Sequence, residues 1–243
     1  MRNVKTGHAK PIVCLDAGHY GKYNRSPAVQ AYYESDMAWK LHLLLKSALE
    51  AYGIEVKTTR AKQAEDLALI ARGKASKGCD LFLSIHSNAV GSAVNEAVDY
   101  PLACVQLDGK GNALGLELAQ TIEKIMGTKQ KGKTATRKGS NGEYYGVLRG
   151  AASVGTMGMI LEHSFHTNTR STKWLMDDAN LQKLAKAEAK VIAEYFGISE
   201  NRGGVLYCVQ VGAYSDPKNA EAQLAKVKAA GFDACISTKK STS

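Results

Sequence analysis

The stretch "PIVCLDAGHYG", residues 11 to 21, decides how this chain of 243 residues begins to fold. The run from Pro11 to Asp16 is short and apolar, which is typical of a buried strand, and it ends in Asp-Ala-Gly-His. A histidine directly after such a strand, here His19, is compatible with a packed structural residue, a base or a metal ligand. Each alternative requires different partners elsewhere in the chain.

Apolar runs alternate with amphipathic stretches along the first two hundred residues. We expect further strands at residues 54–58, 80–86, 100–107 and 157–161, and helices at residues 34–52, 64–77, 112–126 and 180–196. This alternation predicts an α/β fold, with a single twisted, mostly parallel (mixed) sheet and helices on both of its faces.

The segment "ISENRGG", residues 198 to 204, marks a break in composition. It divides the chain into a domain at 1–198, a linker at 199–204 and a small module at 205–243. The module is expected to be one β-α-β unit: a strand at 205–211, a helix at 217–231 with Asp216 as its cap, and a strand at 232–236. About forty residues in one such unit bury too little surface to be stable alone.

Composition and charge restrict the class of protein. The five cysteines are odd in number and form no CxxC pair, which argues against a disulfide framework or a thiolate zinc site and favours reduced core thiols. No apolar run is long enough to span a bilayer, so the sequence predicts neither a membrane anchor nor a secretion signal. The net charge of +9 predicts attraction to a polyanion: nucleic acid, an acidic membrane face or the phosphate polymers of a bacterial wall.

One segment concentrates this positive charge. The stretch "KIMGTKQKGKTATRK", residues 124 to 138, has six basic residues and no acidic one. It lacks interleaved aromatic residues, so we expect a solvated, mobile loop rather than a nucleic-acid patch. A role as a rim of the active-site groove stays open.

Three expected strands end in a side chain of catalytic type. His19 follows the first strand, His86 the third, and Glu162 ends the strand at 157–161, while Glu34 opens the helix after the His19 loop. Taken singly, each of these residues could have a structural role instead, as a packed histidine or as a carboxylate favoured at a helix N-terminus.

Side chains at the carboxyl ends of strands in an α/β sheet converge on one crevice, so these four residues are expected to meet. Two imidazoles and a carboxylate then make a zinc site with an open fourth position. The remaining carboxylate, Glu162, suits a general base.

The same residues carry a resemblance. The motifs "DAGHYG" (16–21), "ESDMAWKLHLLL" (34–45), "TTR" (58–60), "DLFLSIHSNA" (80–89) and "YGVLRGAASVGTMGMILEHSFHTN" (145–168) resemble the zinc-dependent N-acetylmuramoyl-L-alanine amidase family, the catalytic domain of bacterial autolysins and phage endolysins. The resemblance implies one Zn²⁺ held by His19, Glu34 and His86, with Glu162 as the catalytic glutamate. It also implies cleavage of the amide between N-acetylmuramic acid and L-alanine in peptidoglycan.

Four more polar residues lie near these motifs. His163, His166 and Asn88 are candidates for substrate binding; of the two histidines, we expect one to face solvent and the other to pack, because successive residues after a strand diverge. Asn168 resembles the closing asparagine of the family and is interpreted as a side chain that holds a loop. The tail at 207–236 is similar to half of a SPOR-type repeat, which implies binding to peptidoglycan glycan strands.

Three other functions are compatible with the sequence. The same metal and base would serve a zinc peptidase that cuts the stem peptide, and an inactive groove would make a wall-binding protein without catalysis. A nucleic-acid binder rests on the net charge alone. The leading hypothesis places the protein at the bacterial cell wall, as a phage lysin made in the host cytoplasm or as a secreted mature fragment.

Overall fold

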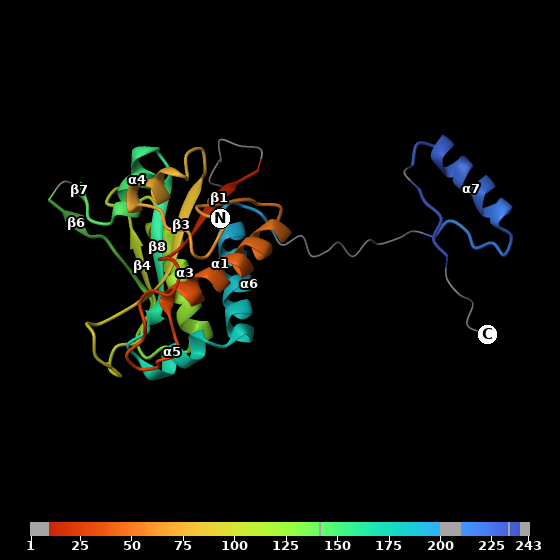
Figure 1. Cartoon of the computed structure of the whole chain (residues 1–243). Coiled ribbons are helices and arrows are strands. Elements are labelled where there is room, and N and C mark those ends of the chain that lie inside the picture. The colour runs from red at the N-terminus through yellow and green to blue at the C-terminus, as the bar shows by residue number, and fades with distance from the viewer. Residues whose placement is uncertain (1–9, 141, 200–209, 233, 239–243) are drawn as a thin grey trace. The chain divides into compact units, whose positions relative to one another are not determined.

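The computed structural model of the chain describes residues 10–140, 142–199, 210–232 and 234–238 (Figure 1). The chain divides into two units, Met1–Glu200 and Asn201–Ser243. Residues 200 to 204 of the predicted linker lie outside the described residues.

A six-stranded sheet forms the centre of the first unit, in the order β2-β1-β3-β8-β4-β5. The strands are β1 (Ile12–Ala17), β2 (Glu55–Thr58), β3 (Leu81–Asn88), β4 (Leu102–Val105), β5 (Lys133–Ala135) and β8 (Met157–Phe165). Neighbouring strands pair in parallel except β4 and β8, which pair antiparallel. The predicted mixed, mostly parallel sheet is therefore confirmed.

Helices cover both faces of this sheet. The helices of the first unit are α1 (Glu34–Ala51), α2 (Leu69–Lys74), α3 (Asn112–Met126), α4 (Gly146–Ser153), α5 (Thr169–Leu175) and α6 (Asp178–Tyr195). Buried residues of α1, α3 and α6 pack with Val13, Leu83 and Leu161 in one core cluster, whereas α4 packs with Phe82 and Ile160 in another. Because alternate residues of a strand point to opposite faces, the apolar strands supply both clusters.

Two expected elements differ from the structure. The helix predicted at 64–77 is confined to α2, and Leu67 offers its carbonyl oxygen to Nε of Arg72 at 2.9 Å instead of to a helical amide. The segment expected as a loop at 124–138 contributes strand β5, which pairs with β4. Gly132 allows this path, since a Cβ there would lie 2.3 Å from the carbonyl oxygen of Ala119 in α3.

The basic segment continues into a small hairpin outside the main sheet. Strands β6 (Lys138–Gly139) and β7 (Gly142–Glu143) pair antiparallel. Helix α4 follows directly and leads into β8. The sequence pattern predicts neither this hairpin nor helices α4 and α5.

The second unit contains helix α7 (Pro217–Ala229), with Asp216 at its N-cap accepting a hydrogen bond from the amide of Lys218 at 2.9 Å. The predicted cap and helix are thus confirmed. The strand expected at 232–236 is absent from the described residues of that range, where Phe232 and Ile236 are exposed. Most of the strand expected at 205–211 lies outside the described residues. Helix α7 has no buried residue, as expected for a unit too small to enclose a core.

Three cysteines, Cys14, Cys79 and Cys104, are buried free thiols, as expected. Cys235 is a free thiol too, but it is exposed, and Cys208 lies outside the described residues. Within the described part of the chain, every helix is too short or too polar to cross a membrane.

Candidate active site

The structure brings three of the predicted site residues together at the carboxyl ends of β1 and β3. One ligand atom from each of His19, Glu34 and His86 lies within 4.8 Å of the others. The Glu34 carboxylate lies between the two rings, with Oε2 3.2 Å from Nε2 of His19 and Oε1 2.8 Å from Nδ1 of His86. Among the described residues, this is the one cluster of its kind.

Backbone geometry after β1 aims His19 at this cluster. Gly18 donates its amide to the carbonyl oxygen of Ile85 at 3.0 Å, and a Cβ at Gly18 would lie 2.4 Å from the ring of His86. His19 follows with a φ of 58°, in the left-handed region that a non-glycine residue seldom adopts. Such a conformation persists only where the surroundings enforce it, and it occurs most often at functional sites.

Glu34 is the first residue of α1 and is only 2% exposed. Its carboxylate accepts hydrogen bonds from the amide of Ser87 at 3.1 Å and from Nδ2 of Asn24 at 2.7 Å. Burial on its own would raise the pKa of Glu34, but hydrogen bonds and positive charge from His19 and His86 outweigh it, so the pKa is lowered. Glu34 is therefore held as a carboxylate.

A chain of hydrogen bonds places a proton on Nε2 of His86. Ser84 donates its hydroxyl proton to Oδ2 of Asp16 at 2.7 Å and lies 3.0 Å from Nε2 of His86. Because the only hydroxyl proton of Ser84 goes to Asp16, its oxygen must accept the proton of Nε2. Nε2 of His86 is thus the donor in this contact, and its Nδ1 faces the Glu34 carboxylate at 2.8 Å.

Asp16 is itself fully engaged below the site. Its Oδ1 accepts from Thr59 Oγ1 at 2.6 Å and from Arg72 Nη1 at 3.1 Å, and both Asp16 and Arg72 are buried. Arg72 also donates to the carbonyl oxygens of Ala17 and His19, both at 3.0 Å. This network ties β1, β3 and α2 to the loop that carries His19.

These contacts fit a cation. With Nε2 of His86 acting as donor, its Nδ1 faces the Glu34 carboxylate at 2.8 Å, and a proton or a metal ion between these two atoms satisfies both. Two imidazoles and one carboxylate are a ligand set that Zn²⁺ takes in hydrolytic sites with a fourth position open. Asn24 supplies a partial positive charge here, since its Nδ2 contacts both Glu34 and Nε2 of His19, the latter at 3.0 Å.

Glu162 lies on the neighbouring strand, directly opposite His86 in the pairing of β8 with β3. Its Oε2 is buried and has no hydrogen-bond partner among the described residues. Burial, reinforced by the negative charge of Glu34, raises the pKa of Glu162 to about 8. A carboxyl group with a near-neutral pKa can both accept and release a proton at neutral pH.

An aromatic stack borders the site on the His19 side. The rings of His19 and Tyr23 are stacked with centroids 5.0 Å apart, and Tyr20 stacks on Tyr23 at 6.0 Å. Both tyrosines are exposed. Tyr20 and Tyr23 therefore lie at the exposed edge of the site, next to His19.

The two histidines predicted as candidates for substrate binding make hydrogen bonds within the protein. His163 and His166 are both buried, so the expectation that one faces solvent is wrong. Strand β8 continues to Phe165 with Ser164 at a φ of 62°, and this irregular backbone turns both rings inward. His163 bridges the carbonyl oxygen of His86 at 3.0 Å and the buried carboxylate of Glu188 at 2.9 Å.

The remaining contacts of this region hold its backbone. His166 lies 2.9 Å from the carbonyl oxygen of Ser87. Asn88 accepts from the amide of Ala89 at 2.8 Å, a local contact that gives no evidence of substrate binding. Asn168 caps α5 by accepting from the amide of Ser171, consistent with its predicted role in holding a loop.

Sequence reasoning missed Asn24, Ser84 and the Asp16–Arg72 pair as parts of the site. Asp16 and Ser84 each precede a predicted ligand, His19 and His86, within the same motif. A buried-type strand that carries a polar residue beside a candidate ligand is the signal that could have found them.

A mixed α/β sheet with this cluster and an unpartnered carboxyl oxygen at its strand ends fits a hydrolytic enzyme. Comparison with family models agrees: residues 13–194 match the model described as N-acetylmuramoyl-L-alanine amidase, and residues 179–243 match the SPOR domain model. The overlap, 179–194, lies in α6, whose Leu181 and Leu184 belong to the core of the first unit.

Individual relatives point the same way. The chain is 28% identical over 228 residues to the N-acetylmuramoyl-L-alanine amidase CwlM of Bacillus licheniformis, covering 92% of this chain and 83% of that protein. It is 29% identical over 198 residues to the endolysin of Bacillus phage SPP1, covering 79% of this chain and 69% of that protein. The solved catalytic domain of CwlV from Bacillus (Paenibacillus) polymyxa var. colistinus superposes with a TM-score of 0.61 at 22% identity, covering 78% of this chain and 99% of that domain.

The chain belongs to the N-acetylmuramoyl-L-alanine amidase family and carries a C-terminal SPOR match. It is an enzyme that hydrolyses the amide bond between N-acetylmuramic acid and L-alanine in peptidoglycan. Its site of action is the bacterial cell wall.

Proposed function

We propose that this amidase is zinc-dependent, with His19, Glu34 and His86 as the ligands of one Zn²⁺ and Glu162 as the general base. The observation that carries the proposal is the meeting of two imidazoles on one buried carboxylate, with an unpartnered carboxyl oxygen on the adjacent strand. When bound, zinc supplies Lewis-acid polarisation of the amide carbonyl and acidifies water.

The protein's own groups then handle the protons. Glu162 takes a proton from the attacking water as the new C–O bond forms, and it returns that proton to the amide nitrogen as the C–N bond breaks. The products are the free lactyl carboxylate of N-acetylmuramic acid and the free amine of L-alanine. Base catalysis of this kind is worth about 10²- to 10⁴-fold in rate.

We propose the catalytic domain at 1–198, the linker at 199–204 and a half SPOR-like wall-binding module at 205–243. The family matches and the helix α7 support this assignment. A phage lysin made in the host cytoplasm and a secreted mature fragment are both compatible with an enzyme that acts on the wall, and the endolysin relative gives the first a precedent.

Digestion of purified walls tests this function. The metal-stripped enzyme is compared with the same sample after addition of one equivalent of Zn²⁺, and the products are identified by mass spectrometry. We expect new N-terminal L-alanine together with intact N-acetylmuramic acid, in the zinc-loaded sample only. Cleavage between two amino acids of the stem peptide would instead identify a zinc peptidase, and equal activity in the stripped sample would refute the metal dependence.

A further inference from the structure

The basic segment singled out in the sequence lies on the same sheet face as Glu162. Lys133 of β5 is directly opposite Leu102 of β4, and Leu102 is directly opposite Glu162 of β8. Residues directly opposite each other in paired strands project to the same face of a sheet. Lys133 therefore belongs to one cross-strand row with Glu162 and, beyond it, His86.

An open cavity of about 580 Å³ adjoins the end of this segment. Three cationic side chains line it, those of Arg137, Lys138 and Arg149, against one carboxylate, that of Glu143. Oε1 of Glu143 accepts from the amide of Leu107, while its Oε2 is buried and has no hydrogen-bond partner among the described residues. The cavity thus presents an excess of positive charge.

These cations lack acidic partners within the described part of the chain. None of Lys133, Arg137, Lys138 and Arg149 takes part in any of its ion pairs. Aromatic rings support two of them: Lys133 lies 4.1 Å from the centroid of Tyr100, and Arg137 lies 3.6 Å from that of Tyr144. Arg149 donates to the carbonyl oxygens of Glu143 and Tyr144, both at 2.8 Å, which holds the hairpin in place.

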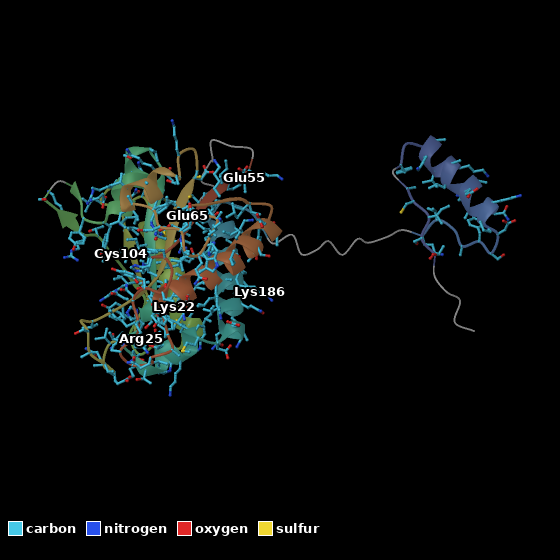
Figure 2. The ribbon with its side chains drawn as sticks, viewed as in Figure 1. Lys22, Arg25, Glu55, Glu65, Cys104 and Lys186 are labelled. Carbon is cyan, nitrogen blue, oxygen red and sulfur yellow. The ribbon has the colours of Figure 1, made fainter. Side chains whose placement is uncertain are left out.

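Packing connects this cavity to the catalytic row. Tyr145, next to the cavity residue Tyr144, contacts Sγ of Cys104 through its hydroxyl at 3.5 Å. Cys104, labelled in Figure 2, is opposite Ile160, two residues before Glu162 on the same strand and hence on the same face. Tyr145, the chain neighbour of a cavity residue, therefore contacts the face of the sheet that carries Glu162.

The role of Glu162 as proton donor determines which half of the substrate lies beside it. A carboxyl group that returns a proton to the leaving nitrogen must face the leaving half of the substrate, which is the peptide. Strand β8 stands between β3, which bears His86, and β4, which leads to β5. The peptide half therefore extends from Glu162 toward β4 and β5, where the unpaired cations lie.

We propose that Lys133, Arg137 and Arg149, here called the cationic edge, form a subsite for a free carboxylate of the stem peptide. This inference rests on the proposed function, because it needs Glu162 as the proton donor. Guanidinium groups present a planar fork that matches a carboxylate, and the exposed Arg137 lies with its guanidinium carbon 3.6 Å from the centroid of the Tyr144 ring.

Two small substrates that differ in one group test the subsite. They are N-acetylmuramoyl-L-alanyl-D-glutamate with its γ-carboxyl group blocked as an amide, and the same molecule with its α-carboxylate replaced by an amide as well. The variants are Arg137→Gln, the charge-retaining Arg137→Lys and the control Lys131→Gln, an exposed residue of the same segment that does not line the cavity. The zinc-loaded full chain is used throughout, and kcat/KM is measured for each pair.

We expect Arg137→Gln to lower kcat/KM for the acid about 3- to 10-fold, through KM, while the amide changes less than about twofold. Arg137→Lys should keep part of the preference, and Lys131→Gln all of it. The unchanged rate on the amide also reports that the variant is folded. Equal losses on both substrates, or no loss on either, would overturn the subsite and leave the proposed function standing.

Two further outcomes distinguish a failure of the proposed function from binding of a different anion. If the unmodified enzyme cleaves neither small substrate and also leaves whole walls uncut, the proposed function fails and the subsite fails with it. A wall-borne phosphate is the rival anion, so whole walls are compared before and after removal of their phosphate polymers. If the defect of Arg137→Gln appears only on walls that retain phosphate, the edge binds that polymer and the peptide proposal is wrong.

Discussion

Glu162 of β8 lies directly opposite His86 of β3, and this register places the unpartnered carboxyl group beside the cluster of His19, Glu34 and His86. A shift of one residue in the pairing would turn Glu162 to the other face of the sheet, away from the cluster. The register between two parallel strands thus positions the site as much as the identity of its residues does.

Replacing Glu162 with Gln should remove turnover while leaving the fold and the metal in place. The amide keeps the shape of the side chain but cannot take a proton from water, so we expect kcat to fall about 10²- to 10⁴-fold. Release of N-terminal amines from purified walls measures this. Glu117→Gln, an exposed change in α3, serves as the control and should retain full activity. An active Glu162→Gln enzyme that binds zinc normally would exclude Glu162 as the base.

Ser84→Ala should weaken zinc binding through His86. The Ser84 hydroxyl accepts a hydrogen bond from Nε2 of His86 and donates one to Asp16. This orients the ring so that Nδ1 of His86 can act as the ligand atom. Loss of such a partner behind a metal ligand typically costs 10- to 100-fold in affinity. Competition with a chromogenic chelator measures the zinc Kd directly. A Kd within twofold of the parent protein's would show that Ser84 does not orient His86.

His42, only 2% exposed on α1, should make the fold sensitive to acid. Burial lowers the pKa of His42 from 6.5 to about 4. Because the unfolded chain binds the proton more readily, the stability that neutral His42 confers is complete above pH 6.5 and is lost as the pH falls toward 4. The loss amounts to about 3 kcal/mol at pH 4.

Urea unfolding of the parent protein and of His42→Leu, at several pH values between 4 and 7, isolates this contribution. The difference in unfolding free energy between the two proteins should move in favour of the variant as the pH drops. A difference that stays constant across this range would mean that His42 titrates in the folded protein as it does in the unfolded chain.

Much of the fold follows from local patterns in the sequence. The apolar runs of β1, β3 and β8 and the periodic apolar face of α1 are long enough to identify, and Asp216 with Pro217 marks the start of α7. Strand β5 could not be found this way, because its Lys-Thr-Ala sequence has no apolar alternation. It exists because it pairs with the outer edge of β4, a tertiary requirement.

The candidate site likewise has residues that could be predicted from the sequence and residues that could not. His19, Glu34, His86 and Glu162 could be proposed because strand ends in an α/β sheet converge. The inward turn of His163 and His166 could not, since it depends on the left-handed backbone at Ser164 and on Glu188, a residue far along the chain. Asn24 and Ser84 act through hydrogen bonds that only the folded structure brings together.

Crystallographic data collected above and below the zinc absorption edge, on the full chain loaded with Zn²⁺, test the central claim most directly. The account predicts one anomalous peak per chain, in contact with His19, Glu34 and His86, and no peak there in Glu34→Gln crystals prepared in the same way. No peak at these residues in the parent protein, or a peak held by other side chains, would contradict it.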